Sequence, residues 1–299
     1  MADPARRLRT NAAGPFYVDA SCIDCDACRQ LAPATFAERG EFSAVAAQPR
    51  DASELAAALR ALVACPVGAI GDAAHRPVAD AVGAFPLRVD GPVSYLGFNA
   101  RASYGANAYL LEHPGGNWMI DAPRWNAALA RAVAARGGLR YVFLTHRDDV
   151  ADAARYAAHF GARRIIHARD ESAQPDAEIV VAGDEPVAFG DLTVIPTPGH
   201  TRGHCVLHHG PYLFSGDHLA WDRDAQRLSA HPDVCWYDWS TQLHSVAKLA
   251  AYAFRWLLPG HGQSVQLDAA AMRAEVRALV ARASGDRAQR SSSSASSTS

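Results

Sequence analysis

Four segments of the chain each place an imidazole or a carboxylate directly after a short apolar run. These side chains are His146, His200, Asp217 and His261. Short apolar runs of this kind predict buried strands, and the loops that follow neighbouring strands meet at one edge of a sheet. Imidazole and carboxylate groups are ligands of zinc and of non-haem iron. The four side chains therefore predict one shared metal site.

Four of the six cysteines form a second set with metal-binding spacing. Cys22, Cys25 and Cys28 have two residues between neighbours, and the distant Cys65 is followed by Pro66. A 4Fe-4S cluster needs four thiolates directed at one small volume, and a close-set trio with one distant Cys-Pro supplies them. The spacing therefore predicts a 4Fe-4S cluster. A structural zinc site, a three-iron cluster and inert thiols are the alternatives that the residues leave open.

Hydrophobic spacing predicts the elements that position these residues. Helices are expected over 51–65, 124–136, 150–160 and 240–257, and from residue 268 onward. Apolar runs between them predict strands, so that strand, loop and helix alternate along most of the chain. We expect an α+β protein with domains at 14–75 and 85–280 and a disordered Ser-rich tail at 281–299, which is too polar to fold.

The composition excludes several kinds of partner. The chain is 49% hydrophobic and 20% charged, with a formal net charge of −2 and no block of Lys or Arg. A nucleic-acid partner is not expected, because no basic stripe is present to neutralise phosphates. A membrane is not expected either, because no run of about 18 apolar residues occurs. Clustered cysteines favour metal or redox use over disulfides, and we expect a cytoplasmic protein.

The cysteine pattern resembles a known type of iron-sulfur domain. From Tyr17 to Ile70 the chain resembles a single-cluster ferredoxin domain, in which the cluster ligands stand where this chain has Cys22, Cys25, Cys28 and Cys65. The interval before Cys65 is long and no second cysteine trio occurs. The resemblance therefore implies one 4Fe-4S cluster held by these four thiols.

The histidine loops resemble a second family. Their motifs are Thr145-His146, Thr197-Pro198-Gly199-His200, Ser215-Gly216-Asp217 and Leu258-Pro259-Gly260-His261. In order and spacing they are similar to the metallo-β-lactamase superfamily, over roughly residues 85–280. The resemblance implies an αββα sandwich after the small ferredoxin-like domain, with a metal site at one edge. It also implies that the four side chains are ligands, that Asp217 can bridge two metals, and that Asp121 helps to hold the site.

The chain departs from that family after its first histidine. The family has a second histidine two residues further on and an Asp-His pair four and five residues further on, whereas this chain has Asp148, Val150 and Ala151. Asp148 and Asp149 are weaker candidate ligands, because an aspartate at the start of a helix commonly serves as its cap. A full dinuclear zinc site is therefore not expected.

The remaining histidines, cysteines and loop aromatics are expected to be mainly structural. His204 is expected to be a packed loop residue or a donor to a ligand. Cys205 and Cys235 are expected to be buried thiols. Structural or surface roles are expected for His208, His209 and His218, and Trp236, Tyr237 and Trp239 are expected either to wall a substrate pocket or to pack in the core.

Three functions are compatible with these residues. The first is a metal-dependent hydrolase, with zinc or iron at the histidine site and Asp217 as the best candidate for accepting a proton. The second is an oxidoreductase in which the cluster exchanges electrons with one non-haem iron, since persulfide dioxygenases of this superfamily bind one iron at the positions of His146, His200 and Asp217. The third is a catalytically inactive scaffold or electron carrier. A small-molecule substrate and a redox partner are the expected partners.

Overall fold

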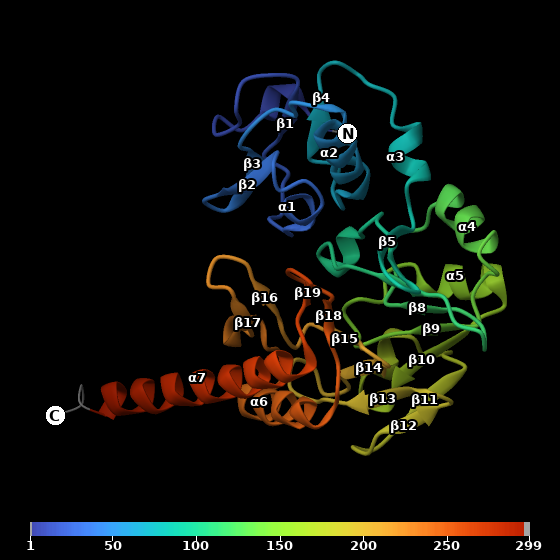
Figure 1. Cartoon of the computed structure of the whole chain (residues 1–299), viewed down its shortest axis with the longest axis vertical. Coiled ribbons are helices and arrows are strands. Elements are labelled where there is room, and N and C mark those ends of the chain that lie inside the picture. The colour runs from blue at the N-terminus through green and yellow to red at the C-terminus, as the bar shows by residue number, and fades with distance from the viewer. Residues whose placement is uncertain (1, 296–299) are drawn as a thin grey trace. The chain divides into compact units, whose positions relative to one another are not determined.

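The structure is a computed structural model that describes residues 2–295 (Figure 1). The chain forms two compact units. Unit 1 consists of Met1–Leu144, Asp148–Ile165 and Asp176–Ile179, and unit 2 of Thr145–Arg147, Ile166–Pro175 and Val180–Ser299. The boundaries of these two units differ from the expected domain limits at 14–75 and 85–280. Those domain limits therefore stay a prediction.

The cysteine-bearing part of unit 1 is built from two small sheets and two helices. Strand β1 (Phe16–Val18) pairs antiparallel with β4 (Ile70–Asp72), and β2 (Phe36–Arg39) pairs with β3 (Phe42–Val45). Helix α1 (Ala27–Leu31) follows the cysteine loop, and α2 (Ala52–Ala64) ends at Cys65. The Asp51 side chain accepts hydrogen bonds from the backbone N–H groups of Ser53 and Glu54, which confirms the expected cap.

The rest of unit 1 carries most of a seven-stranded sheet with the order β11-β10-β9-β8-β7-β6-β5. Pairing is antiparallel from β5 to β8 and parallel between β8, β9 and β10. The strands are β5 (Leu87–Asp90), β6 (Val93–Tyr95), β7 (Tyr109–Leu111), β8 (Trp118–Ile120), β9 (Tyr141–Phe143), β10 (Arg163–His167) and β11 (Ile179–Val181). Short helix α3 (Ala79–Gly83) precedes β5.

Two helices of unit 1 begin later than the sequence led us to expect. Helix α4 (Ala127–Ala134) starts after Asn126, whose side chain accepts hydrogen bonds from two backbone N–H groups of the first turn. Residues 124 and 125 therefore belong to the preceding loop. Helix α5 (Ala153–Phe160) starts after Asp152, because residue 151 has a positive φ of 29° that no α-helix accommodates.

Unit 2 contains a six-stranded sheet with the order β12-β13-β14-β15-β18-β19. Its strands are β12 (Val187–Phe189), β13 (Leu192–Pro196), β14 (Cys205–His209), β15 (Tyr212–Gly216), β18 (Trp256–Pro259) and β19 (Val265–Gln266). A separate hairpin is formed by β16 (Ala220–Asp222) and β17 (Arg227–Ser229). Buried side chains of the sheet and of the helices that follow it form one apolar core, which includes Ile195, Leu213, Val246 and Met272.

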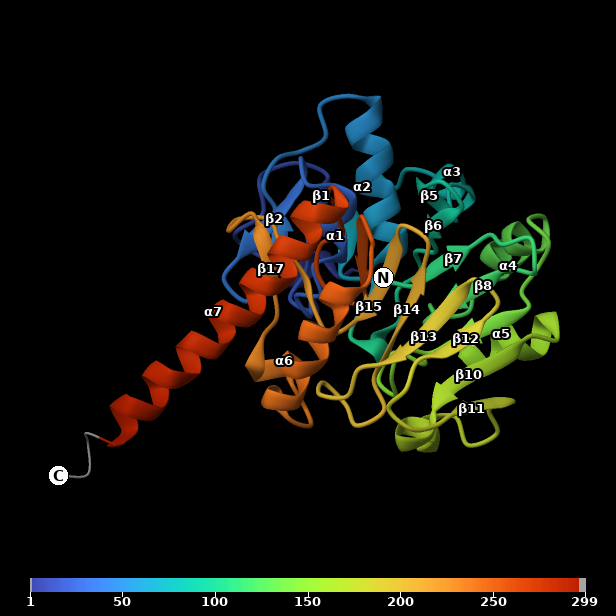
Figure 2. The ribbon, with the colours of Figure 1, turned by 60° about the horizontal axis from the view of Figure 1, so that its bottom comes forward.

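Helices α6 (Trp239–Lys248) and α7 (Ala269–Ala295) lie side by side in unit 2 (Figures 1 and 2). The helix expected over 240–257 ends at residue 248 because the buried residues 256–259 pair in parallel with β15 as a strand. Helix α7 runs through part of the stretch where we expected a disordered tail, and residues 296–299 lie outside the described part. Within residues 2–295, no helix is both long enough and apolar enough to cross a membrane.

Candidate functional site

Four side chains of unit 2 meet at one carboxylate oxygen. The Nε2 atoms of His146, His200 and His261 lie 3.6, 3.5 and 3.8 Å from Asp217 Oδ2. Ligand atoms bound about 2.1 Å from one metal are about 3.4 Å apart in a tetrahedron. The structure thus brings together all four of the main sequence-predicted residues at spacings that fit one metal ion. Their role as ligands stays a prediction.

Burial and neighbouring charge make the site suitable for a cation. His146 and His200 are fully buried, and their rings are perpendicular with centroids 4.8 Å apart. The Thr145 hydroxyl lies 3.0 Å from His146 Nδ1 and so fixes which nitrogen faces Asp217. Burial raises the pKa of Asp217, but the imidazoles of His261, His146 and His200 lower it, and the net pKa is below the ordinary value. The carboxylate is therefore ionised at neutral pH.

Two further histidines support this carboxylate. His204 is fully buried, with Nδ1 2.9 Å from the Thr197 hydroxyl oxygen, and its Nε2 accepts the backbone N–H of Asp217 at 3.3 Å. Burial, followed by the charge of neighbouring imidazoles, lowers its pKa, so His204 is neutral. His218 is also buried and stacks on His204 with centroids 3.9 Å apart.

The loop that carries His200 is fixed mainly through its backbone. The backbone N–H of Trp236 donates to the carbonyl of His200 at 3.0 Å, and that of Asp238 donates to the carbonyl of Gly199 at 3.0 Å. A side chain at Gly199 would place its Cβ 2.2 Å from the Cα of Gln242, at a φ of +148°. Glycine is therefore required for helix α6 to pack against the loop.

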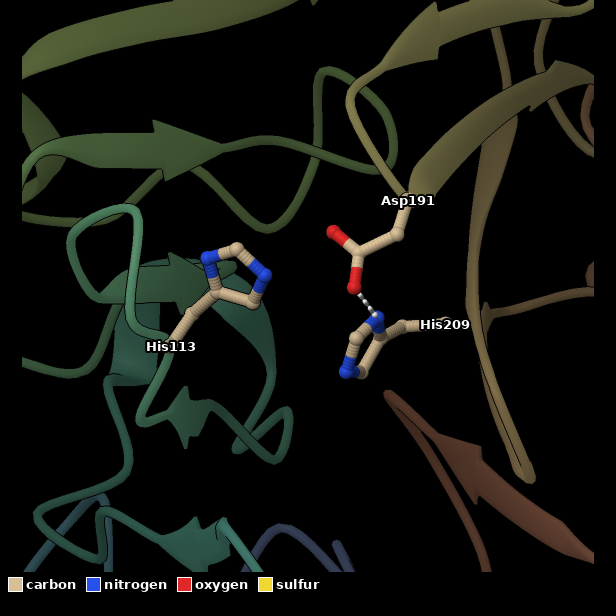
Figure 3. A group of neighbouring side chains, drawn as sticks. All are labelled: His113, Asp191 and His209. Carbon is tan, nitrogen blue, oxygen red and sulfur yellow. Dashed lines mark ion pairs between the residues drawn. The ribbon is translucent and has the colours of Figure 1, made fainter.

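The loop aromatics and the remaining candidates take different positions. Trp236 and Tyr237 are exposed, so neither packs in the core. Cys205 is buried as expected, whereas Cys235 is only half-buried and donates to the carbonyl of Gly199 at 3.1 Å. His209 forms an ion pair with Asp191 at 3.6 Å (Figure 3), which agrees with a surface role.

Asp170 is a buried carboxylate that sequence reasoning did not identify. Its Oδ2 accepts hydrogen bonds from the backbone N–H of Arg147 at 3.2 Å and from the Thr201 hydroxyl at 2.5 Å. Its Oδ1 accepts the backbone N–H of Gly203 at 3.1 Å. These donors follow His146 and His200 in the chain, so one side chain connects the loops of two candidate ligands. No sequence signal marked Asp170, because its partners are mainly backbone groups distant in sequence.

Replacing Asp170 by asparagine is expected to weaken metal binding at this site. The asparagine NH2 group is a hydrogen-bond donor, and it would face other donors that already point at this side chain. The loop of His146 or the loop of His200 must therefore shift. Loss of a group that orients ligands typically lowers metal affinity by about 10–100-fold. Competition with a chromophoric chelator measures the effect, and Asp184→Asn is the control because Asp184 is exposed and pairs with Arg169. Equal affinity in both variants would contradict a positioning role for Asp170.

Three aspartates expected near the metal belong to unit 1. Asp121 is buried and has a φ of 53°, a strained value for a residue other than glycine and one that is common at functional sites. Asp148 is exposed and Asp149 is buried. The supporting role of Asp121 and the ligand roles of Asp148 and Asp149 stay predictions.

The four expected cluster ligands line one enclosed cavity within unit 1. Apart from Cys22, Cys25, Cys28, Cys65 and Ser43, all its lining residues are apolar. Burial raises the pKa of Cys25 to about 12 and also raises the pKa of Cys28. Such thiols ionise only beside a strong positive charge, which bound iron supplies. The donor set and its dry surroundings therefore fit an iron-sulfur cluster.

Backbone N–H groups are directed at two of these sulfurs. Asp24 donates to Cys22 Sγ at 3.4 Å, and Ala69 donates to Cys65 Sγ at 3.3 Å. The Arg29 side chain holds the cysteine loop through contacts of 2.6 Å with both Asp24 and Asp26. Hydrogen bonds to cluster sulfurs stabilise the more negative, reduced state of a cluster.

The chain is similar to known proteins in both of its parts. Residues 18–72 match the family described as the 4Fe-4S single cluster domain of Ferredoxin I. Across the rest, the chain is 38% identical over 117 residues to a hydroxyacylglutathione hydrolase of Acidiphilium cryptum, covering 38% of this chain and 46% of the relative. For the same enzyme of Anaeromyxobacter dehalogenans, identity is 35% over 128 residues, covering 40% and 49%. The matches span slightly under half the length of these relatives.

The chain is thus similar to a single-cluster ferredoxin domain over residues 18–72 and, across the rest, to hydroxyacylglutathione hydrolases. Solved structures similar to this two-domain chain include DIM-1 metallo-β-lactamase, with 18% identity, a TM-score of 0.49, and coverage of 66% of this chain and 96% of that one. Another is a metallo-β-lactamase superfamily protein of Sulfolobus tokodaii, with 18% identity, a TM-score of 0.44, and coverage of 59% and 79%. The expected α+β class and the ferredoxin-like domain are confirmed.

Proposed function

We propose that the metallo-β-lactamase-fold domain is a metal-dependent hydrolase with one metal ion held by His146, His200, Asp217 and His261. The observation that carries the proposal is the approach of three imidazole Nε2 atoms to one carboxylate oxygen within 3.5–3.8 Å. Zinc and iron both accept this ligand set. A metal bound there supplies Lewis acidity, which polarises a carbonyl oxygen and lowers the pKa of a coordinated water.

The residues of the chain have separable tasks in this proposal. Oδ2 of Asp217 faces the three imidazoles, whereas Oδ1 is buried and forms no hydrogen bond within residues 2–295. Oδ1 is therefore the atom that can accept a proton from an attacking water. The lowered pKa keeps Asp217 in the ionised, proton-accepting form. His204 holds the backbone of Asp217, and Asp170 holds the loops of His146 and His200.

The relatives indicate a substrate class for this proposal. They are named hydroxyacylglutathione hydrolases. We propose that the substrate here is likewise an acylated thiol, whose carbonyl carbon is attacked by water to release a carboxylic acid and the free thiol. Trp236 and Tyr237 have exposed side chains and belong to the segment whose backbone holds the His200 loop, which makes them the proposed wall of the substrate pocket.

The test measures thiol release by protein loaded separately with zinc and with iron. Acylglutathione and an acyl-coenzyme A are offered as thioester substrates, and a matched oxygen ester, which releases an alcohol in place of a thiol, is followed by the release of its acid. We expect metal-dependent release of thiol from at least one thioester, and the metal-free protein is the baseline. Rates equal to that baseline with both metals and all three substrates would refute the hydrolase proposal.

A second candidate function is an oxidoreductase, favoured by the iron-sulfur domain in the same chain. Two histidines and one carboxylate on iron leave positions open for oxygen or sulfur chemistry. A redox partner would then supply or remove electrons through the cluster. Metal and acid-labile sulfide analysis of protein purified without oxygen separates the two candidates. About four irons and four sulfides with one further iron favour the oxidoreductase, whereas the cluster with zinc favours the hydrolase.

A further inference from the structure

Arg124 places a positive charge beside a ligand of the cluster. This residue lies in the loop between β8 and α4 of unit 1, far from the cysteines in sequence. Its guanidinium donates to the carbonyl of Cys65 at 3.2 Å and to the carbonyl of Val63 at 2.7 Å. Both carbonyls belong to the C-terminal end of α2, where the helix dipole is negative. The cation therefore stands at the point where α2 presents Cys65 to the cluster cavity.

The guanidinium is fixed in this position by its surroundings. It donates a third hydrogen bond to the carbonyl of Asn99 at 2.6 Å, and it lies over the Phe98 ring at 5.7 Å. The backbone of Arg124 is also fixed, because its N–H donates to the carbonyl of Phe98 at 2.9 Å and its own carbonyl accepts the Tyr156 hydroxyl at 3.1 Å. Little rearrangement is available to move the charge away from Cys65.

The same region of unit 1 also packs against a second cluster ligand, Cys25. The backbone N–H of Asn99 donates to the carbonyl of Ala64 at 3.2 Å, and the Asn99 amide donates to the carbonyl of Gly105 at 2.7 Å. Gly105 approaches Cys25 so closely that an added Cβ would lie 2.8 Å from its sulfur. Charges interact more strongly where water is excluded, so the effect of Arg124 on the cluster is enhanced.

We propose that Arg124 is a tuning residue that raises the reduction potential of the 4Fe-4S cluster. Reduction adds one electron to the cluster and increases its negative charge by one, without requiring a proton. A fixed cation next to Cys65 stabilises the reduced state more than the oxidised state. Through the contacts of this guanidinium, the loop between β8 and α4 becomes part of the environment that determines the reduction potential of the cluster. This inference does not depend on the reaction at the histidine site.

The experiment is a redox titration of the full chain with dithionite, monitored by the EPR signal of the reduced cluster. Arg124→Met and Arg124→Gln remove the charge, Arg124→Lys keeps it, and Arg131→Gln is the control because Arg131 is exposed on α4. At the wild-type midpoint we expect the ratio of reduced to oxidised cluster to fall about tenfold in the neutral variants, a shift of about 59 mV to more negative potential. Arg124→Lys and the control are expected to stay close to the wild type.

Iron and sulfide content are measured in every variant, so that loss of the cluster is distinguished from a change in its potential. If Arg124→Met does not hold a cluster, Arg124→Gln, which retains hydrogen-bond donors, decides the question. A cluster-bearing neutral variant with the wild-type potential would overturn the proposal. So would an equal shift in Arg124→Lys and Arg124→Gln, or loss of the cluster in all three variants, because Arg124 would then act through packing and not through charge.

Discussion

Replacing Cys25 by serine is expected to remove the iron-sulfur cluster from the protein. Cys25 is one of only four thiols that line the cavity, and no other residue of that lining offers a side chain that commonly replaces a lost thiolate on iron. Serine differs by a single atom, but its hydroxyl is a poor iron ligand. We therefore expect a loss of about four irons and four sulfides per chain, together with loss of the brown absorption that dithionite bleaches in the wild type.

A matched control separates ligand loss from general damage. Cys205 is a fully buried thiol, but it lies on β14 in unit 2 and does not line the cavity. Cys205→Ser is expected to keep the full cluster content. Metal at the histidine site is expected to remain in both variants. Full iron and sulfide in Cys25→Ser would contradict the assignment of this ligand, and zinc in place of iron in the wild type would contradict the cluster itself.

The cysteines show what local sequence can predict about a site. Three thiols separated by short intervals and one distant Cys-Pro specify a cluster because ligand spacing along the chain controls which groups can converge. The supporting contacts could not be predicted in this way. Arg124 is bound to the carbonyls of Val63, Cys65 and Asn99, and a backbone carbonyl carries no signature in the sequence. Only the tertiary structure brings the loop at Arg124 to the end of α2.

The histidine site shows the same division between what the sequence predicted and what it did not. His146, His200, Asp217 and His261 follow apolar runs, and the ends of strands converge whatever their exact limits. The end of α6 was misplaced because the apolar residues 256–259 fit a helix face and a buried strand equally well. Asp170 was missed because burial of a carboxylate depends on distant donors.

Replacing His200 by alanine is expected to empty the histidine site while the protein stays folded. The His200 imidazole is buried and its Nε2 lies 3.5 Å from Asp217 Oδ2, so its replacement removes one of the four proposed metal ligands. The loop itself is held by backbone hydrogen bonds from Trp236 and Asp238, and alanine preserves both. Loss of metal is expected to lower hydrolysis about a thousandfold, equivalent to about 4 kcal/mol of transition-state stabilisation.

Metal content per chain and thiol release are measured on the same His200→Ala preparation. His208→Ala is the control, since His208 lies on the same sheet and its ring contacts the Ala253 carbonyl and the Tyr252 ring, away from the four proposed ligands. The 4Fe-4S content should be unchanged in both variants, because the four cysteines belong to unit 1 and both substituted histidines to unit 2. Wild-type metal affinity in His200→Ala would show that the metal is held elsewhere. If His200→Ala lost the cluster as well as the metal, the two sites would be coupled, and the independent assembly argued from Cys25→Ser would be wrong.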